Sequence, residues 1–358
     1  MRHIGIIGAG VAGLTVAFQR ERLGDRVSLF EAASRPGGQL FSERSGGFVI
    51  EHGAEGFVAG SVAIAELSRS LGIESGVIGQ ELSDSCHFDG ERLIRLGPGE
   101  AGRMLGFQVG SRALGKGIQS FLGGMSELAE ALHARLGPGA TCALGTPIQA
   151  LRRSGERWQL VPRAGATVEV DVLVVATPAA AAAALLAEPF GAAAAELARS
   201  RALSSVTVSL AYPRTAVAHA LDATGFVVAE EAQVEGFRAC SFVSSKLRGR
   251  APGGHALLRL FFRPSDEELR DLGDEAWVAR AERSARRALT IQGAPERSWV
   301  SRWPHALPVF DAVHRARVAE LEQRLAGSGV LLAGACFHGA GIDGAVRSAA
   351  AAARALDA

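Results

Sequence analysis

A glycine-rich turn near the start of the chain limits most strongly what this sequence can fold into. Residues 2–32 read as an apolar strand, a turn, a helix, a second apolar strand and then an acidic residue, Glu31. In the turn, Gly8, Gly10 and Gly13 fit the pattern G-x-G-x-x-G. The first glycine permits a tight turn, the second lets backbone approach a pyrophosphate, and the third lets the helix pack on the strand. The segment therefore predicts a Rossmann unit that binds an adenine dinucleotide.

Glu31 indicates which dinucleotide would fit. A carboxylate at the end of the second strand can accept hydrogen bonds from a ribose diol, and it would repel a 2′-phosphate, so NADP is disfavoured. The helix N-terminus offers unpaired N–H groups and a positive dipole end to the phosphates. A turn that binds nothing would leave this acidic residue without an explanation.

Composition narrows the class further. A chain of 358 residues with 48% hydrophobic and 21% charged residues is an ordinary globular sequence, long enough for two domains. Its formal net charge of +1 argues against a surface built for nucleic acid or an anionic membrane. The longest apolar run, 172–187, is too short to span a membrane and contains Pro178. With a motif that begins at residue 4, we expect no signal peptide and a cytoplasmic protein.

The four cysteines are far apart and form no C-x-x-C pattern. They could be paired, but we interpret them as mostly buried thiols in a reducing compartment.

Further glycine-rich segments predict a longer ligand than a nicotinamide dinucleotide. Gly37 and Gly38 follow Arg35, which is available for a phosphate, and a second glycine-rich loop follows the strand that ends near Glu51. Near the C-terminus, residues 330–346 again read as strand, glycine loop and helix start. FAD needs more backbone along its ribityl chain and ring than a nicotinamide cofactor. We therefore expect both ends of the chain to fold around one FAD.

The middle of the chain has a different period. Several stretches between residues 203 and 262 alternate apolar and polar residues, which predicts an antiparallel sheet in a second domain. Asp89-Gly90 predicts a hairpin over 86–96, and residues 266–289 read as one helix with Ser265 as its N-cap. Ser126 is expected to cap another helix. The predicted fold class is α/β, with a discontinuous FAD domain (1–60, 121–200 and 300–358) and a substrate domain (61–120 and 201–299).

Several of these segments are similar to sequence motifs of one protein superfamily. They are the E-x-x-x-R-x-G-G run that starts at Glu31, the E-x-G loop at 51–53, the F-x-G-G-M-x-x-L-x-x-A-L segment at 121–132, the R-A-P triplet at 250–252 and the stretch 306–314. The chain resembles the flavin amine oxidase and protoporphyrinogen oxidase superfamily over residues 1–60, 86–96, 118–151, 171–263 and 299–358. The triplet is more particular to the protoporphyrinogen oxidases.

The resemblance implies non-covalent FAD and oxidation of a porphyrinogen, protoporphyrinogen IX or coproporphyrinogen III, with oxygen as acceptor. Hydride would pass from a ring carbon to the flavin, so no dedicated general base is expected. Arg92 is the nearest match to an arginine that holds a propionate, although it could equally be a solvated hairpin residue. The residues that the turn, the loops and the resemblance assign to FAD are Gly8, Ala9, Gly10, Val11, Ala12, Gly13, Glu31, Ala32, Arg35, Gly38, Gly53, Ala54, Glu55, Gly56, Ile148, Trp303, Gly334, Ala340, Gly341 and Ile342.

One departure from the family concerns size. Between Leu96 and Ser120 the family carries a long helical segment that covers the tetrapyrrole pocket and contacts the membrane, whereas here about two dozen residues remain. We therefore expect a more open pocket, or one closed by a partner or by a second copy in a homodimer.

Two alternatives to a porphyrinogen oxidase stay open. An amine oxidase would place a lysine on the strand 203–212, which has none, and we expect Lys246 to be solvated. His338 could be a base or a flavin tether, but a structural hydrogen bond is the simpler interpretation. With its covering segment missing, the chain could also be a flavin-binding accessory scaffold.

Overall fold

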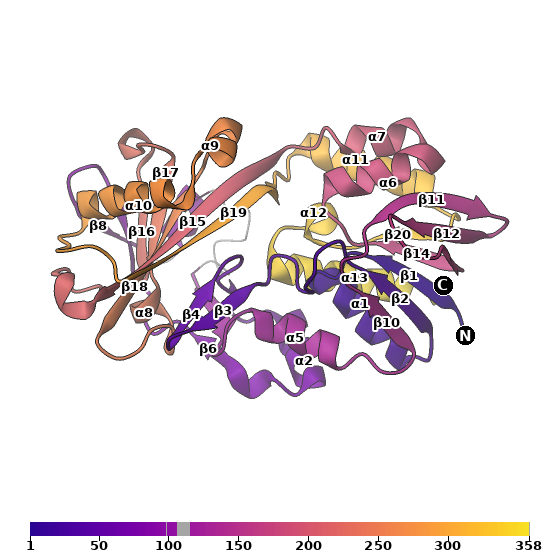
Figure 1. Cartoon of the computed structure of the whole chain (residues 1–358), viewed down its shortest axis with the longest axis horizontal. Coiled ribbons are helices and arrows are strands. Elements are labelled where there is room, and N and C mark those ends of the chain that lie inside the picture. Colours follow the sequence, from indigo (N-terminus) through magenta and orange to yellow (C-terminus); the bar gives the residue numbers. More distant parts are fainter. Residues whose placement is uncertain (98, 106–114, 358) are drawn as a thin grey trace.

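The structure is a computed structural model of the 358-residue chain, and it describes residues 1–97, 99–105 and 115–357. Figure 1 shows two large sheets at opposite ends of the molecule, joined by long strands and by a small hairpin between them. This arrangement matches the predicted α/β class with two sheets of different kinds.

The first sheet is parallel and has the strand order β10-β2-β1-β14-β20. Its strands are β1 (His3–Ile7), β2 (Arg26–Phe30), β10 (Ala140–Ala143), β14 (Val172–Val175) and β20 (Val330–Leu332). Alternate residues of one strand belong to different cores: Val174 packs with one set of helices, and Leu173 and Val175 pack on the other face. Because both faces are buried, these strands are continuous apolar runs rather than alternating ones.

Helices cover both faces of this parallel sheet. The core on one face includes side chains of α1 (Val11–Arg22), α2 (Val62–Leu71), α5 (Ser126–Ala134) and α13 (Gly341–Ala355). The other face carries α6 (Ala179–Phe190), α7 (Ala192–Leu197), α11 (Ala312–Leu325) and a small sheet of β11 (Ile148–Ser154), β12 (Arg157–Pro162) and β13 (Val168–Val170). The carboxyl ends of β1 and β20 therefore open onto the helix starts of α1 and α13.

The second sheet has seven strands in the order β19-β15-β18-β17-β16-β7-β8. They are β7 (Ser85–Phe88), β8 (Leu93–Leu96), β15 (Ala202–Pro213), β16 (Gly225–Val228), β17 (Phe237–Phe242), β18 (His255–Phe262) and β19 (Arg297–Pro308). The hairpin predicted around Asp89-Gly90 is confirmed as β7–β8. The antiparallel pairing predicted for the strands between residues 203 and 262 is also confirmed. β7, which the sequence analysis did not assign to this sheet, joins it by pairing parallel to β16.

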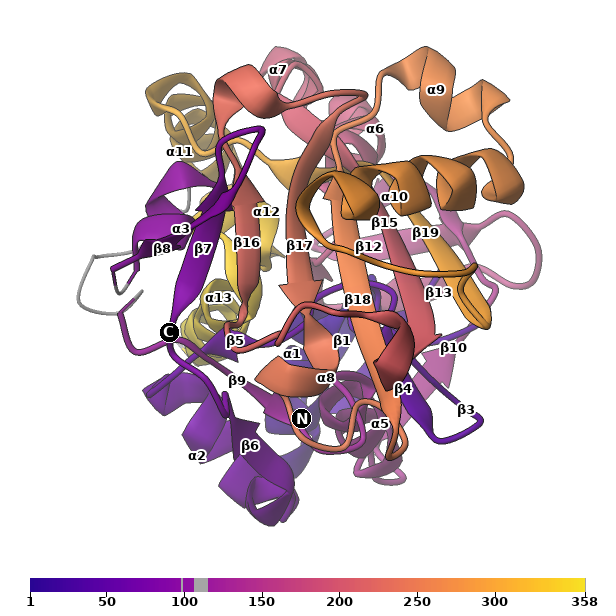
Figure 2. The same ribbon diagram turned by 90° about the vertical axis from the view of Figure 1, so that its left-hand side faces the viewer.

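A long helix, α10 (Asp274–Ala288), crosses one face of the second sheet (Figure 2). The predicted single helix over 266–289 is two helices, α9 (Asp266–Asp271) and α10 (Asp274–Ala288). Leu272 ends the first in extended backbone, and Gly273 begins the second with φ −70° and ψ 172°. The predicted cap is confirmed, since the Ser265 hydroxyl accepts the N–H of Glu268 in a capping box.

The remaining elements are short. A hairpin of β3 (Ser42–Ser45) and β4 (Phe48–Glu51) lies between the two large sheets, and β5 (Phe57–Val58), β9 (Ile118–Phe121) and β6 (Val77–Gly79) form a third small sheet. The short helices are α3 (Glu100–Met104), α8 (Val243–Lys246) and α12 (Ala335–His338), with 3-10 turns at Glu74–Gly76, Arg214–Ala216 and Glu230–Ala232. The segment 96–117 contains α3, and residues 98 and 106–114 lie outside the described residues.

One predicted cap was wrong. Ser126 is the first residue of α5, and the N-cap position is Met125. The Ser126 hydroxyl instead accepts the backbone N–H of Ser42 at 2.7 Å, and its own N–H donates to the Ser42 hydroxyl at 2.9 Å. A tertiary contact 84 residues away thus takes the hydroxyl that a local pattern assigns to a cap.

The division into two domains remains a prediction. Within the segment assigned to the substrate domain, β7 and β8 extend the seven-stranded sheet, whereas α2 packs in the core beside α1 and α13.

Candidate functional site

The turn after β1 is closed by contacts that exclude side chains at two of its glycines. Gly8 has φ +103°, and a Cβ there would lie 2.6 Å from the carbonyl oxygen of Ala176. A Cβ on Gly13 would lie 1.9 Å from the carbonyl oxygen of Gly8. Because these are backbone atoms, neither collision can be relieved by a side-chain rotation. The two glycines bring the start of α1 against β1.

Gly10 differs from its neighbours in the turn. A Cβ built on it meets no atom of the described chain within 4 Å. Gly10 is the N-cap of α1, it has no side-chain cap, and the first turn of the helix contains no acidic residue. Val11, Ala12 and Gly13 therefore begin a helix whose first N–H groups are not capped by a side chain, and such groups can bind a phosphate.

Glu31 lies against this turn. One carboxylate oxygen accepts the N–H of Ala9 at 2.7 Å, and the other accepts the N–H of Ala33 at 2.8 Å. Each oxygen keeps a further lone pair, so the carboxylate can still accept hydroxyl donors. Ala32, next to it, is exposed. Ile148 is 9% exposed and packs in the same core as Phe30, the residue before Glu31. These residues are assembled where the adenosine end is expected.

The second glycine loop touches the first. Gly37 donates its N–H to the carbonyl of Ala9 at 2.7 Å, and a Cβ on Gly38 would lie 3.3 Å from the Cα of Gly10. Arg35 stacks over the Phe41 ring, 4.1 Å from its centroid, and donates to the carbonyl of Gly38 at 2.8 Å. Burial lowers the pKa of Arg35, opposed by Glu31. The Arg35 guanidinium is thus held at the edge of the turn.

The loop of residues 51–56, which we call the 51–56 loop, continues this surface toward the second sheet. A Cβ on Gly53 would lie 1.8 Å from the carbonyl oxygen of Gln39, and 3.2 Å from the Trp303 ring. Trp303 donates its indole N–H to the carbonyl of His52 at 2.6 Å. Ala54 donates to the Gln39 carbonyl, and a Cβ on Gly56 would lie 2.4 Å from the carbonyl oxygen of Gln119. Close backbone packing on both sides therefore requires these two glycines.

The C-terminal segment approaches from the other side. Gly334 has φ +131°, and its missing Cβ would lie 3.8 Å from the Cβ of Ala12. α13 starts at Gly341 after Ala340, again without a side-chain cap. Ile342 is 8% exposed and packs in the core, so any ligand contact there belongs to its backbone. The structure thus brings a second uncapped helix start beside α1.

His338 has a structural role in the described chain. Its Nδ1 lies 2.7 Å from the Ser348 hydroxyl and its Nε2 lies 2.7 Å from Glu322, while Ser348 accepts the N–H of Gly334 at 2.9 Å. The histidine therefore ties α11 to the glycine loop before α13.

Arg92 is far less enclosed than the other predicted site residues. Its side chain is 79% exposed, and its only ion-pair partner in the described part of the chain is Asp89, at 3.6 Å. Both residues belong to the turn of the β7–β8 hairpin, which lies at the edge of the second sheet.

The expectation that Lys246 is solvated was wrong. Its ammonium lies 2.7 Å from the carboxylate of Glu55, and only 14% of its side chain is exposed. Lys246 ends α8 rather than lying on a strand. The sequence analysis also missed Arg250 and Arg259, which are 0% and 3% exposed and lie beside the same loop. Arg250 is the first residue of the R-A-P triplet on which the resemblance partly rested. That triplet was the sequence signal that could have identified Arg250 as a site residue.

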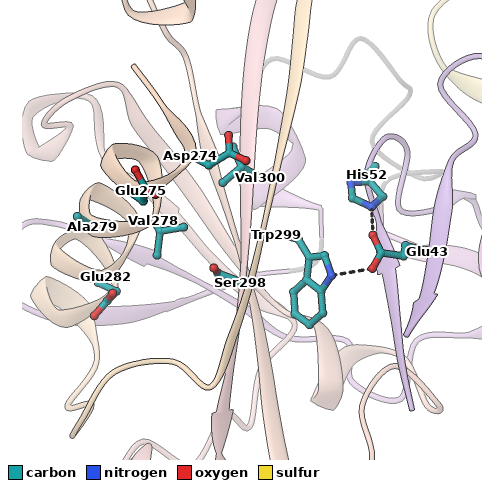
Figure 3. A pocket seen from close by; sticks show the side chains of 10 residues that line it. All are labelled: Glu43, His52, Asp274, Glu275, Val278, Ala279, Glu282, Ser298, Trp299 and Val300. Atoms are coloured by element: carbon teal, nitrogen blue, oxygen red, sulfur yellow. Dashed lines mark hydrogen bonds and ion pairs between the residues drawn. The ribbon is translucent and has the colours of Figure 1, made fainter. Parts of the chain in front are cut away.

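A pocket of about 490 Å³ opens on the edge strand β19 (Figure 3). Glu43 lies in it between two partners: its carboxylate is 3.0 Å from His52 and accepts the indole N–H of Trp299 at 3.0 Å. Burial lowers the pKa of His52, opposed by Glu43. None of the residues predicted to hold FAD lines this pocket, so it is separate from the glycine loops. Its lining is Glu43, His52, Asp274, Glu275, Val278, Ala279, Glu282, Ser298, Trp299 and Val300.

The four cysteines are all free, as expected. Burial raises the pKa of the Cys142 thiol to about 11 and that of Cys336 to about 12. Across residues 1–97, 99–105 and 115–357, no three histidine, cysteine or acidic side chains come together in a way that could hold a metal ion. Likewise, none of the helices described is long and apolar enough to cross a membrane.

The fold and the paired glycine loops define a class: a Rossmann-type dinucleotide-binding protein with a second, mixed sheet beside the cofactor end. Residues 6–71 match the NAD(P)-binding Rossmann-like domain, and residues 95–357 match the flavin containing amine oxidoreductase family. The second match covers more than half of the chain, and the chain therefore belongs to the flavin containing amine oxidoreductase family. Membership implies a flavin, and it confirms the superfamily that the sequence motifs indicated.

Several curated relatives bear the name coproporphyrinogen III oxidase. The protein from Bacillus subtilis is 32% identical over 202 residues, which are 55% of this chain and 42% of the relative. The one from Propionibacterium freudenreichii is 30% identical over 65% of this chain and 43% of the relative. The matched part of this chain thus spans under half the length of these two relatives. A third, from Mycobacterium tuberculosis, is 26% identical over 96% of this chain and 95% of the relative.

Solved structures share the fold at low identity. A candidate protoporphyrinogen oxidase from Exiguobacterium sp. 255-15 has a TM-score of 0.83 and 20% identity, and covers 99% of this chain and 98% of its own. Cyclohexylamine oxidase from Brevibacterium oxydans has a TM-score of 0.75 and 15% identity, with complete coverage of both chains. The two-sheet architecture is therefore common to enzymes with different substrates.

Proposed function

We propose that this chain is an FAD-dependent oxidase that converts a porphyrinogen to a porphyrin with oxygen as acceptor. One observation carries the proposal. Glycine loops from both ends of the chain meet at the uncapped start of α1, and the 51–56 loop leads from them to the second sheet. The open space at Gly10 and the lone pairs left on Glu31 fit an extended dinucleotide.

In this proposal the residues named above hold FAD. The backbone of Gly8 to Gly13 takes the pyrophosphate, Glu31 the adenosine ribose, and Ile148 contacts the adenine. The 51–56 loop, Trp303, Gly334 and Ala340 to Ile342 lie along the flavin end. FAD supplies the acceptor for a hydride from the substrate, and the protein supplies binding, orientation and exclusion of water.

The substrate class comes from the relatives named coproporphyrinogen III oxidase, and a substrate rich in carboxylates needs cations. Arg92, on the exposed hairpin turn, is one candidate. Arg263 is a second. Arg263 directly follows β18. Residues two apart along a strand share a face, so Arg263 continues the face that carries Arg259 and Phe261. None of the acidic residues in the described chain pairs with it. Burial lowers the pKa of Arg263, and the neighbouring Arg238 lowers it further, as expected for cations without a counterion.

The amine oxidase alternative has weaker support in the structure. The side chains of β15 that face away from α10 include Thr207 and Ser209, and no lysine lies on this strand. Tyr212, the only tyrosine of the chain, is fully buried in the core beneath α10. The aromatic cage that amine oxidases usually place beside the flavin would therefore need other residues.

Anaerobic reduction of the flavin in the purified holoprotein tests the proposal. The protein is mixed separately with coproporphyrinogen III, protoporphyrinogen IX and a panel of amines, and oxygen is then admitted. We expect the flavin absorbance to bleach with a porphyrinogen and porphyrin fluorescence to grow faster than autoxidation allows. Bleaching with an amine alone would assign the chain to the amine oxidases. Reduction by dithionite but by no substrate would favour the accessory-scaffold alternative and contradict the proposal.

A further inference from the structure

Five charged side chains gather under the 51–56 loop, and we call them the loop ion cluster: Glu51, Glu55, Lys246, Arg250 and Arg259. Lys246 lies 2.7 Å from Glu55, and Arg250 lies 3.2 Å from Glu51. Arg259 donates to the carbonyl of Gly53 at 2.6 Å. Three of the five, Lys246, Arg250 and Arg259, come from the part of the chain that builds the second sheet. The cluster therefore joins that sheet to the loop predicted to lie along the flavin.

The cluster is enclosed. Arg250 and Arg259 are 0% and 3% exposed, and the side chain of Glu55 is 11% exposed. In both arginines, Nε and Nη1 are buried without a hydrogen-bond partner among the described residues. Buried guanidinium groups are stabilised only where negative charge or acceptors lie close, so these unsatisfied nitrogens indicate that Glu51 and Glu55 do not fully balance the cations of the cluster.

The charges of the loop ion cluster also do not balance. Three cations face two carboxylates, which leaves one positive charge in excess. Burial acts to raise the pKa of Glu55, but Lys246 and Arg259 outweigh it and lower that pKa, so Glu55 is ionised. Burial raises the pKa of Glu51, opposed by Arg250, and protonation of Glu51 would only increase the excess. The cluster is positive in either state of Glu51.

A continuous path of contacts links this charge to the phosphate turn. Gly38 lies against Gly10, Gln39 follows Gly38, and the Gln39 carbonyl meets Gly53. An extended dinucleotide whose pyrophosphate lies at Gly10 would reach the 51–56 loop with its ring end. Ser120 supports the same loop, since its hydroxyl donates to the carbonyl of Glu55 at 2.9 Å and accepts from Arg250 at 2.6 Å.

We propose that the loop ion cluster raises the reduction potential of the bound flavin. Two-electron reduction places negative charge on the pyrimidine end of the ring, and a fixed excess of positive charge in a water-poor site stabilises it. The substrate loses the hydride that the flavin accepts, so the step needs no further reactant. The inference rests on the proposed binding of FAD. Lys246 and Glu55 act here as electrostatic positioning residues and do not touch the reacting atoms.

Opposite charge changes test the inference. Lys246→Met removes a positive charge and should lower the equilibrium constant for flavin reduction about tenfold, which is about 30 mV for a two-electron couple. Glu55→Gln removes a negative charge and should raise it by a similar factor. The double variant Lys246→Met/Glu55→Gln has the net charge of the wild type and should return close to its potential. Potentials are measured by equilibration with reference dyes, and the affinity for sulfite, which adds to flavin N5, should change in the same order.

The controls separate charge from structure. Lys246→Arg keeps the charge and should keep the potential. Arg324→Met removes an exposed charge on α11 and should have no effect. If both single variants shift the potential in the same direction, or the double variant does not return, the cluster has a structural role only and the inference is wrong. If the folded wild type binds no FAD, the proposed function itself fails, and an FAD titration distinguishes that result from the other two.

Discussion

At the scale of single residues, the three glycines of the G-x-G-x-x-G motif occupy their positions for different physical reasons. Gly8 and Gly13 are required by backbone contacts inside the protein, at 2.6 and 1.9 Å from carbonyl oxygens. Gly10 has open space where a Cβ would stand. The motif therefore combines two glycines that build the turn with one that leaves room for a ligand.

This difference predicts opposite outcomes for two alanine variants. Gly13→Ala forces α1 away from β1 and should destabilise the protein by about 3 kcal/mol, at the upper end of the cost of overpacking. Gly10→Ala, with φ −67°, should leave the stability of the FAD-free protein within about 0.5 kcal/mol but weaken FAD binding at least about tenfold. Urea unfolding without FAD and FAD titration measure the two effects. Equal stability losses in both variants would contradict the distinction.

At the scale of elements, α10 holds one face of the second sheet through Trp277. This side chain is fully buried, its ring centroid is 5.6 Å from that of Phe262 on β18, and Arg280 lies over it at 4.6 Å. The opposite face of β18 carries Arg259 and meets the 51–56 loop. The helix and the loop thus pack on different sides of the same strands.

We expect Trp277→Ala to cost about 3 kcal/mol of unfolding free energy, because a large buried side chain is replaced by a cavity. The value is at the low end for such a change, since the indole N–H has no partner among the described residues. In the native state the variant should bind FAD as the wild type does. Val313→Ala, at a position on α11 that is 56% exposed, is the matched control and should change stability by less than about 0.5 kcal/mol. A stability loss under 1 kcal/mol for Trp277→Ala would show that α10 is not anchored there.

At the scale of the whole molecule, partly buried histidines in three distant regions act on stability in the same direction. Burial lowers the pKa of His3 in the parallel sheet, of His52 before the 51–56 loop and of His219 beside the second sheet. His219 accepts the N–H of Leu221 on Nδ1 at 2.9 Å, which needs an unprotonated nitrogen. At these three histidines the folded chain therefore binds fewer protons near pH 6 than the unfolded chain.

The lowered pKa values determine how the free energy of unfolding depends on pH. Each folded-state pKa lies below the unfolded value of about 6.5, so the stabilisation is fully present above pH 6.5 and is lost as the pH falls through the folded values. Urea unfolding between pH 5 and 8 should show a free energy that declines below about pH 6.5, with an uptake of about one to three protons on unfolding. His219→Gln should reduce this slope, whereas a variant at the exposed His305 should not. A free energy that rises on acidification over this range would contradict the assignment.

Much of the fold could be predicted from local pattern. The strand–turn–helix of residues 4–23, the hairpin at Asp89-Gly90 and the cap at Ser265 were predicted correctly, because neighbours in the sequence decide each of them. The single helix over 266–289 was wrong because a helical period continues through Gly273 although the backbone does not. The site residues of the glycine loops were predicted from their sequence, and their use in binding FAD stays a prediction.

The sequence by itself determined the Rossmann unit and the family. The reason is that the glycines, Glu31 and the alternating strands meet requirements of backbone conformation that involve only a few neighbouring residues. Only the tertiary structure decided the partners of buried polar groups. Ser126 bonds to Ser42 across 84 residues, and Lys246 pairs with Glu55 across 191 residues. A charged side chain is stabilised by whatever group the fold brings within reach, and the local pattern around Lys246 contains no trace of that group.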